Sequence, residues 1–215
     1  MKIGLFGGTF NPFHNGHIGI SQYVRDRLAL DCIFFIPSAT PPHKPDSDLA
    51  PAPDRFHMVE KSIRSFDRLL VSDKELNRKG PSYTIDTVRS FMAEYAPDTR
   101  FYLLMGTDAF LDINTWKATR QLFETVTVVI MLRSGWGSPE RIAAFVNEHI
   151  SDQYRYNDTR NRFFHPDQQE IIICQVPVID ISSTMVRERV RKKLAISDLV
   201  PLPVEEMIKK KELYS

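Results

Sequence analysis

Short runs of apolar residues alternate with segments in which apolar residues recur at steps of three and four. The apolar runs predict buried strands at 3–6, 32–36, 69–71, 101–105, 126–132 and 171–174. The segments with helical spacing predict helices at about 18–28, 54–66, 82–95, 108–123 (in two pieces), 138–150, 183–193 and 203–211. This alternation predicts an α/β fold: a Rossmann-like, doubly wound parallel sheet with helices on both faces, followed by C-terminal helices.

Two segments depart from this alternation. Residues 37–53 hold six prolines together with His43 and Lys44, and form a long loop directly after the second strand. Residues 151–169 are polar and aromatic without a clear period, which favours a solvated insertion over a flap or an assembly contact. Neither segment marks a linker. We therefore expect one domain over 1–215, with a polar insertion at about 151–169 and a C-terminal helical part at about 183–215.

Composition excludes several classes of function. The 215 residues include 28 Lys and Arg against 27 Asp and Glu, a net charge of +1. This balance argues against a globally basic nucleic-acid-binding protein and against a polybasic membrane anchor. No apolar stretch approaches the ~20 residues of a membrane span, and the N-terminus turns glycine-rich too early for a signal peptide, so we expect a cytoplasmic protein. Cys32 and Cys174 lie in separate apolar runs, which predicts buried thiols.

The first candidate site is the segment GGTFNPFHNGH at 7–17, directly after the first strand. It is neither a P-loop nor the GxGxxG fingerprint. Gly7 and Gly8 let backbone N–H groups approach a ligand. On the first turn of a helix, His14 and His17 would share one face near the positive end of the helix dipole, where phosphate oxygens bind well. The alternatives are two unrelated surface histidines, or a metal pair completed by the loop residue His43, which no carboxylate or cysteine spacing supports.

The second candidate site is the segment DISSTMVR at 180–187, after the last strand. Ser182, Ser183 and Thr184 would stand at a helix N-terminus, offering hydroxyls and unpaired N–H groups. Arg187 lies four residues beyond Ser183, so both face the same way, and a guanidinium matches the geometry of phosphate. Taken alone, this segment favours an ordinary N-cap followed by a solvated arginine over a phosphate-binding site.

Together these segments resemble the two signatures of the nucleotidyltransferase superfamily, (T/H)xGH and ISSTxxR. Within it, PPHK at 41–44, GPSYTIDT at 80–87, MGTDAF at 105–110 and Trp116 look like bacterial nicotinate-nucleotide adenylyltransferases. That family often has Asp where this chain has Asn11, and Asn can still accept a hydrogen bond in the turn. The resemblance implies a sheet of the nucleotidyltransferase type. It also implies transfer of the adenylyl group of ATP to nicotinate mononucleotide, giving deamido-NAD and pyrophosphate in NAD biosynthesis.

The resemblance also implies a role for each matched residue. The catalytic residues would be His14, His17 and Arg187. The ATP-binding residues would be Gly7, Gly8, Thr9, Phe10, His14, Gly16, His17, Gly106, Asp108, Ile181, Ser182, Ser183 and Arg187. Lys44, Tyr83, Thr84 and Trp116 would bind the mononucleotide. Mg²⁺ would be held mainly by the ATP phosphates, without a metal site of the protein's own, and no nucleic acid or membrane partner is implied.

Three alternatives stay open at the level of sequence. Two lie in the same superfamily: an adenylyltransferase acting on nicotinamide mononucleotide, or one acting on pantetheine phosphate. The third is a catalytically silent nucleotide-binding regulator on the same fold, against which the intact His14, His17, Ser183 and Arg187 weigh. A homo-oligomer is compatible with all of them.

Overall fold

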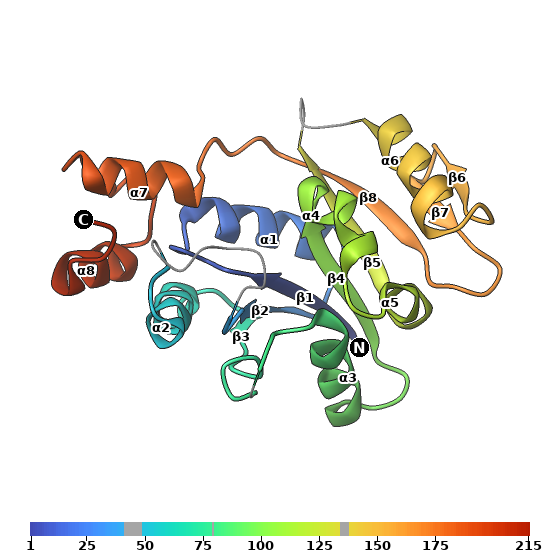
Figure 1. Cartoon of the computed structure of the whole chain (residues 1–215), viewed down its shortest axis with the longest axis horizontal. Helices are drawn as coiled ribbons and strands as arrows, with labels where there is room; N and C mark the ends of the chain where they lie inside the picture. The colour runs from blue at the N-terminus through green and yellow to red at the C-terminus, as the bar shows by residue number, and fades with distance from the viewer. Residues whose placement is uncertain (41–48, 79, 134–137) are drawn as a thin grey trace.

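An eight-stranded sheet forms the centre of the computed structural model, which describes residues 1–40, 49–78, 80–133 and 138–215 (Figure 1). The strands, in the order in which they lie side by side, are β3 (Leu69–Val71), β2 (Cys32–Pro37), β1 (Lys2–Gly8), β4 (Arg100–Gly106), β5 (Thr127–Arg133), β8 (Ile171–Val176), β7 (Arg162–Phe164) and β6 (Arg155–Asn157). The helical elements are α1 (Asn15–Leu28), α2 (Ala52–Ile63), α3 (Thr84–Glu94), α4 (Thr107–Leu111), the 3-10 turn η2 (Ile113–Thr115), α5 (Thr119–Thr125), α6 (Pro139–Phe145), the π-helical turn η3 (Val146–Ile150), α7 (Ser183–Arg191) and α8 (Leu202–Lys211).

The topology creates a crevice beside β1. From β1 the chain moves outward to β2 and β3, and then crosses to the other side of β1 for β4, β5 and β8. These six strands are parallel, whereas β7 and β6 are antiparallel at one edge. The reversal is the switch point of a doubly wound sheet, where ligands bind beyond the carboxyl ends of the strands. The predicted α/β class is confirmed.

Helices cover both faces of the sheet and bury two apolar clusters. Apolar residues of α1, α2, α7 and α8 pack on one face, and those of α3, α4, α5 and α6 pack on the other. Along β1, Leu5 belongs to one cluster and Phe6 to the other, because successive side chains of a strand point to opposite faces. This double burial explains why the parallel strands are continuous apolar runs in the sequence. Cys32 and Cys174 are buried and unpaired, as predicted.

The insertion predicted to be solvated at 151–169 is instead part of the sheet. Residues Arg155–Asn157 and Arg162–Phe164 pair as a hairpin, and Phe163 lies opposite Ile171 of β8. Tyr154 and Phe163 are only 2% and 1% exposed, because their rings join the cluster beneath α5 and α6. The prediction of a solvated insertion is therefore wrong.

Two helix boundaries also differ from prediction. The segment 108–123 contains α4, η2 and α5, three short pieces instead of two. Ser82 does not cap α3: the carbonyl of Tyr83 accepts from the backbone N–H groups of Asp86 and Thr87, so Tyr83 is the N-cap. At α6 the predicted start is confirmed, because Ser138 Oγ accepts a hydrogen bond from the Arg141 N–H.

Candidate active site

A cleft of about 410 Å³ opens at the switch point, between the carboxyl ends of β1 and β4 and the first turns of α1 and α7. Its lining residues are Phe6, Gly7, Gly8, Thr9, Phe10, Asn11, His17, Ile20, Gly106, Thr107, Asp108, Met131, Arg133, Ser182 and Ser183. The structure thus brings most of the residues predicted to bind ATP into one cavity. His14, Gly16, Ile181 and Arg187 are not among the lining residues.

Glycines keep this cleft open. A Cβ atom added to Gly7 or Gly106 would meet no protein atom within 4 Å, so a larger side chain there would project into the space of the cleft. At Gly16 the added Cβ would lie 3.0 Å from Nδ1 of His14. Glycine at this position therefore lets the imidazole of His14 pack against the first turn of α1.

The imidazole of His17 is held in one orientation by rings on several sides. It stacks on Phe13 (centroids 5.2 Å apart, planes at 9°) and on His14 (3.7 Å, 26°), and the edge of Phe10 lies against it (5.0 Å, 83°). His17 Nδ1 lies 3.2 Å from the backbone N–H of His14, which can only donate, so Nδ1 accepts. A neutral His17 therefore carries its proton on Nε2.

His14 stacks against His17 at the N-terminus of α1. His14 is the N-cap residue, with extended backbone, and His17 is the third helical residue, so the two imidazoles lie together at the start of the helix as predicted. The side chain of His14 is buried, and this burial, followed by repulsion from Arg133, lowers the pKa of His14 to about 4. In the ligand-free protein His14 is therefore neutral at pH 7.

The start of α7 faces the same loop. Ser182 Oγ accepts a hydrogen bond from the Met185 N–H at 3.1 Å and caps the helix. Ser183 Oγ donates to the Pro12 carbonyl at 2.9 Å, so this hydroxyl proton is already used inside the protein. The first N–H groups of α7, at Ser183 and Thr184, have no acceptor within the helix and are the donors that this end offers to a ligand.

Arg187 and Asn11 join α7 to the loop after β1. Arg187 Nη1 donates to the Asn11 carbonyl at 2.8 Å, and Nη2 donates to Thr184 Oγ1 at 3.3 Å. Asn11 Oδ1 accepts from the Ala50 N–H at 3.0 Å and from the Tyr214 hydroxyl at 2.7 Å. The prediction that Asn11 serves as an acceptor in the turn is confirmed.

Within the described residues, Thr107 Oγ1 is a buried polar atom without a hydrogen-bond partner on a residue that lines the cleft. His14 Nδ1 and Arg187 Nε also lack partners, on residues next to the lining. Buried polar groups are normally satisfied, so a polar ligand in the cleft would suit the Thr107 hydroxyl. Sequence reasoning missed Thr107 and Arg133, although both lie at the carboxyl ends of predicted strands. The rule that ligands bind beyond the carboxyl ends of parallel strands would have found Arg133 at the end of β5.

Comparisons with known proteins agree with this geometry. A family model described as cytidylyltransferase-like matches residues 5–189, a stretch that begins in β1 and ends in α7. The chain belongs to this family.

Two relatives of this cytidylyltransferase-like chain carry the name "Probable nicotinate-nucleotide adenylyltransferase". That of Geotalea uraniireducens is 35% identical over 215 residues, covering 100% of this chain and 99% of the relative. That of Syntrophotalea carbinolica is 37% identical over 216 residues, covering 100% and 97%. Among solved structures, a Plasmodium falciparum nicotinic acid mononucleotide adenylyltransferase complexed with NaAD superposes with a TM-score of 0.73 at 18% identity, covering 99% of this chain and 97% of that one. The resemblance drawn from the motifs is confirmed.

Of the residues predicted to bind the mononucleotide, Tyr83, Thr84 and Trp116 lie outside the 410 Å³ cleft. Tyr83 and Thr84 open α3, and Trp116 follows η2. Lys117 joins the two segments, because its Nζ lies 4.4 Å above the ring of Tyr83 and 3.1 Å from Asp86 Oδ2. Tyr83 and Trp116 are partly buried against the same apolar cluster, so each ring keeps one accessible part.

The remaining predictions concern metals, membranes and the Pro-rich loop. Lys44 and His43 lie outside the described residues. Within the described part of the chain, no three His, Cys, Asp or Glu side chains gather closely enough to hold a metal ion. In the same part, every helix is too short or too polar to span a bilayer.

Proposed function

We propose that the protein transfers the adenylyl group of ATP to nicotinate mononucleotide, giving deamido-NAD and pyrophosphate in NAD biosynthesis. The observation that carries the proposal is the cleft at the switch point, which brings His17, with its Nδ1 held by the His14 N–H, together with Ser182 and Ser183 at the start of α7. The names of full-length relatives support the choice of reaction. An anion ligand would satisfy the buried donors that the protein itself leaves unpaired.

The reaction needs little from the protein beyond positioning and charge stabilisation. A phosphate monoester has a second pKa of about 6, so the mononucleotide phosphate is largely ionised at pH 7 and needs no general base. One of its oxygens attacks the α-phosphorus of ATP, the bond from that phosphorus to the bridging oxygen breaks, and pyrophosphate leaves with the electron pair. His17 Nε2–H donates to the charge that develops at the α-phosphate. The in-line geometry is set by the walls of the cleft.

The triphosphate would be held from two sides. The N–H groups of Ser183 and Thr184 and the hydroxyl of Ser182 offer donors at the start of α7, where the helix dipole favours an anion. Arg133 lines the opposite wall. Arg187 Nε and His14 Nδ1, both buried and unsatisfied, would gain acceptors when phosphate oxygens enter. Asp108 lies beside Gly106 at the end of β4, where it would contact a ribose hydroxyl.

The mononucleotide would bind near the start of α3. The N–H groups of Tyr83 and Thr84 suit the nicotinate carboxylate, because a helix N-terminus favours an anion over the neutral amide of nicotinamide. Trp116 would stack on the pyridine ring. Lys44, which belongs to the Pro-rich loop, would contact a phosphate.

The cleft fits a metal ion that arrives with ATP. Asp108 is the one carboxylate among its described lining residues, and Mg²⁺ is commonly bound by one or two carboxylates plus substrate phosphates and water. Nucleotidyltransferases generally use a divalent metal with ATP, and we propose Mg²⁺, which would neutralise phosphate charge. We further propose that the protein works in the cytoplasm, in keeping with its free thiols.

Pyrophosphate release tests the proposal. Purified protein is incubated with ATP, Mg²⁺ and one of three acceptors: nicotinate mononucleotide, nicotinamide mononucleotide or pantetheine phosphate. We expect turnover with nicotinate mononucleotide to exceed that with the other two. Faster turnover of either other acceptor would assign the protein to that reaction, and binding of ATP without turnover of any would indicate the regulator.

A further inference from the structure

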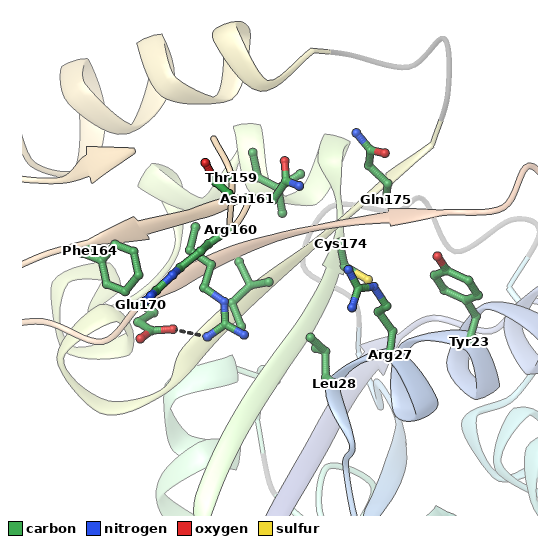
Figure 2. Close-up of a pocket in the computed structure, with 13 residues that line it drawn as sticks. Tyr23, Arg27, Leu28, Thr159, Arg160, Asn161, Phe164, Glu170, Cys174 and Gln175 are labelled. Atoms are coloured by element: carbon green, nitrogen blue, oxygen red, sulfur yellow. Dashed lines mark hydrogen bonds and ion pairs between the residues drawn. The ribbon is translucent and has the colours of Figure 1, made fainter. Parts of the chain in front are cut away.

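A second cleft, of about 520 Å³, lies away from the active site, between α1, β8 and the turn of the β6–β7 hairpin (Figure 2). Its lining residues are Tyr23, Arg27, Leu28, Thr159, Arg160, Asn161, Arg162, Phe164, Glu170, Ile172, Ile173, Cys174 and Gln175. It shares no lining residue with the active-site cleft. Its volume lies in the range of small-molecule sites, about 300–1,000 Å³.

The walls of this cleft are strongly cationic. Arg27, Arg160 and Arg162 stand against a single acid, Glu170, which leaves a net charge of 3 − 1 = +2 on the lining. Glu170 is already engaged, because its Oε2 accepts from Arg162 Nη1 at 2.6 Å. Arg27 and Arg160 form no ion pair with any acid in the described part of the chain. On a protein whose net charge is +1, this is a local excess of positive charge in a concave site.

The accessible surface of the cleft is mostly polar, because Ile172 and Cys174 at its base are each only 4% exposed. Figure 2 shows Tyr23 and Arg27 on α1 at one side, and Thr159, Arg160 and Asn161 on the hairpin at another. A base or another flat ring can stack on the exposed ring of Tyr23, and phosphate groups fit guanidinium groups.

Both main walls of the cleft continue into the active site. The helix α1 that carries Tyr23 and Arg27 begins at the His14–His17 turn, and β8 leads through 177–181 to Ser182 and Ser183. From His17 to Arg27 the helix rises about 15 Å, since each residue advances it by ~1.5 Å. A ligand that bridges α1 and the hairpin would therefore contact the helix that begins at His14–His17. It would also lie on β8, the strand that leads to Ser182 and Ser183.

We propose that this cleft is an effector site for a small phosphate-bearing molecule of the nucleotide class, distinct from the site of catalysis. The proposal does not depend on which mononucleotide the enzyme adenylylates. The unpaired guanidinium groups of Arg27 and Arg160 bind the phosphates, and the exposed ring of Tyr23 stacks on the ring system. Asn161 and Gln175 supply the hydrogen-bonding groups at the rim.

Calorimetric titration with ADP tests the proposal. ADP also suits the active site, so we expect two bound per wild-type chain, one in Arg187→Gln and one in the double variant Arg27→Gln/Arg160→Gln. The double variant should keep the wild-type rate of pyrophosphate release without effector, and lose at least tenfold in affinity at the second site. The matched control Arg64→Gln/Arg120→Gln removes the same charge from exposed positions elsewhere and should keep both sites.

Three results would overturn the proposal. One is a single ADP per wild-type chain that disappears in Arg187→Gln. Another is an equal loss of affinity in the control double variant, which would make the effect one of general charge. The third is a change of sedimentation mass in Arg27→Gln/Arg160→Gln, which would make the cleft an interface between copies of the chain. Circular dichroism confirms that each variant is folded before it is titrated.

Discussion

Arg55 Nη1 donates to the carbonyl of Thr9 at 2.7 Å, which ties a fully buried guanidinium to the loop that lines the active-site cleft. Its other donors reach the carbonyls of Ala39 at 3.2 Å and Ala50 at 2.9 Å. These two residues lie near the two ends of the Pro-rich loop at 37–53, so one side chain sets the spacing between both ends of that loop and the glycine-rich turn. Arg55 is therefore a positioning residue that touches no substrate.

Replacing Arg55 by Lys should damage both folding and turnover. An ammonium keeps the charge but cannot reach three carbonyls in a fixed fork, so buried acceptors lose their donors at a cost of about 3 kcal/mol. We expect a lower urea midpoint, and a loss of kcat in the folded fraction. Arg64→Lys, on an exposed arginine just after the same helix, is the control and should change neither. A stable Arg55→Lys protein with normal kcat would show that the fork is dispensable.

Replacing His17 should lower kcat more than it raises KM for the mononucleotide. The Nε2–H donor is aimed at charge that develops in the transition state, and loss of one such donor typically costs about 100–1,000-fold in kcat. His17→Asn is the sharper variant, because its Oδ1 can still accept from the His14 N–H and keep the turn. Steady-state kinetics decide the point: a variant with unchanged kcat would exclude His17 from charge stabilisation.

The buried His14 should make stability depend on pH. Its pKa is about 4 in the folded protein against 6.5 in the unfolded chain, so the unfolded state binds more protons between these values. Stability should therefore fall as the pH is lowered from about 6.5 to about 4, by on the order of 3 kcal/mol. Urea unfolding at pH 7 and pH 4.5 measures this loss. His14→Gln should reduce it, whereas His57→Gln, on an exposed histidine, should not; equal slopes in all three proteins would contradict the assignment.

Much of the fold could be predicted from local pattern. Strands such as Cys32–Pro37 are buried on both faces, so each leaves an unbroken apolar run, and parallel pairing follows from the intervening helices. The two candidate segments could be found because Gly7–His17 joins the end of β1 to the start of α1, and Ser182–Arg187 opens the helix that follows β8. Their convergence on one cleft follows from the topology of the sheet.

What escaped prediction depends on contacts between distant residues. Arg55 is a charged residue on an amphipathic helix, and nothing local distinguishes it from an exposed arginine. Tyr214 reaches Asn11 across a sequence separation of 203 residues. The hairpin strands Arg155–Asn157 and Arg162–Phe164 have three residues each, too few to show a period of two.

Replacing Trp116 should affect the mononucleotide alone. If the indole stacks on the pyridine ring, Trp116→Ala removes ~1–2 kcal/mol of binding, which is about a tenfold rise in KM for nicotinate mononucleotide. Trp116→Phe keeps an aromatic face and should recover part of the loss. KM for ATP, measured with the same variants, is the internal control. A rise confined to the KM for ATP would move Trp116 to the other substrate.

Replacing Tyr214 tests whether the C-terminal end supports the active site. Its hydroxyl donates to Asn11 Oδ1 at 2.7 Å, and the carbonyl of Asn11 accepts from Arg187, so the three residues form one chain of hydrogen bonds. Burial raises the pKa of Tyr214, which keeps the hydroxyl protonated as a donor.

Tyr214→Phe leaves Asn11 with the Ala50 N–H as a donor and should cost about 1 kcal/mol of stability. We expect KM for ATP to rise because Asn11, whose backbone carbonyl accepts from Arg187, is held less firmly, while KM for nicotinate mononucleotide stays within twofold. Tyr23→Phe, on an exposed tyrosine of α1, is the matched control; a Tyr214→Phe protein with wild-type KM for ATP would show that this hydrogen bond serves stability only.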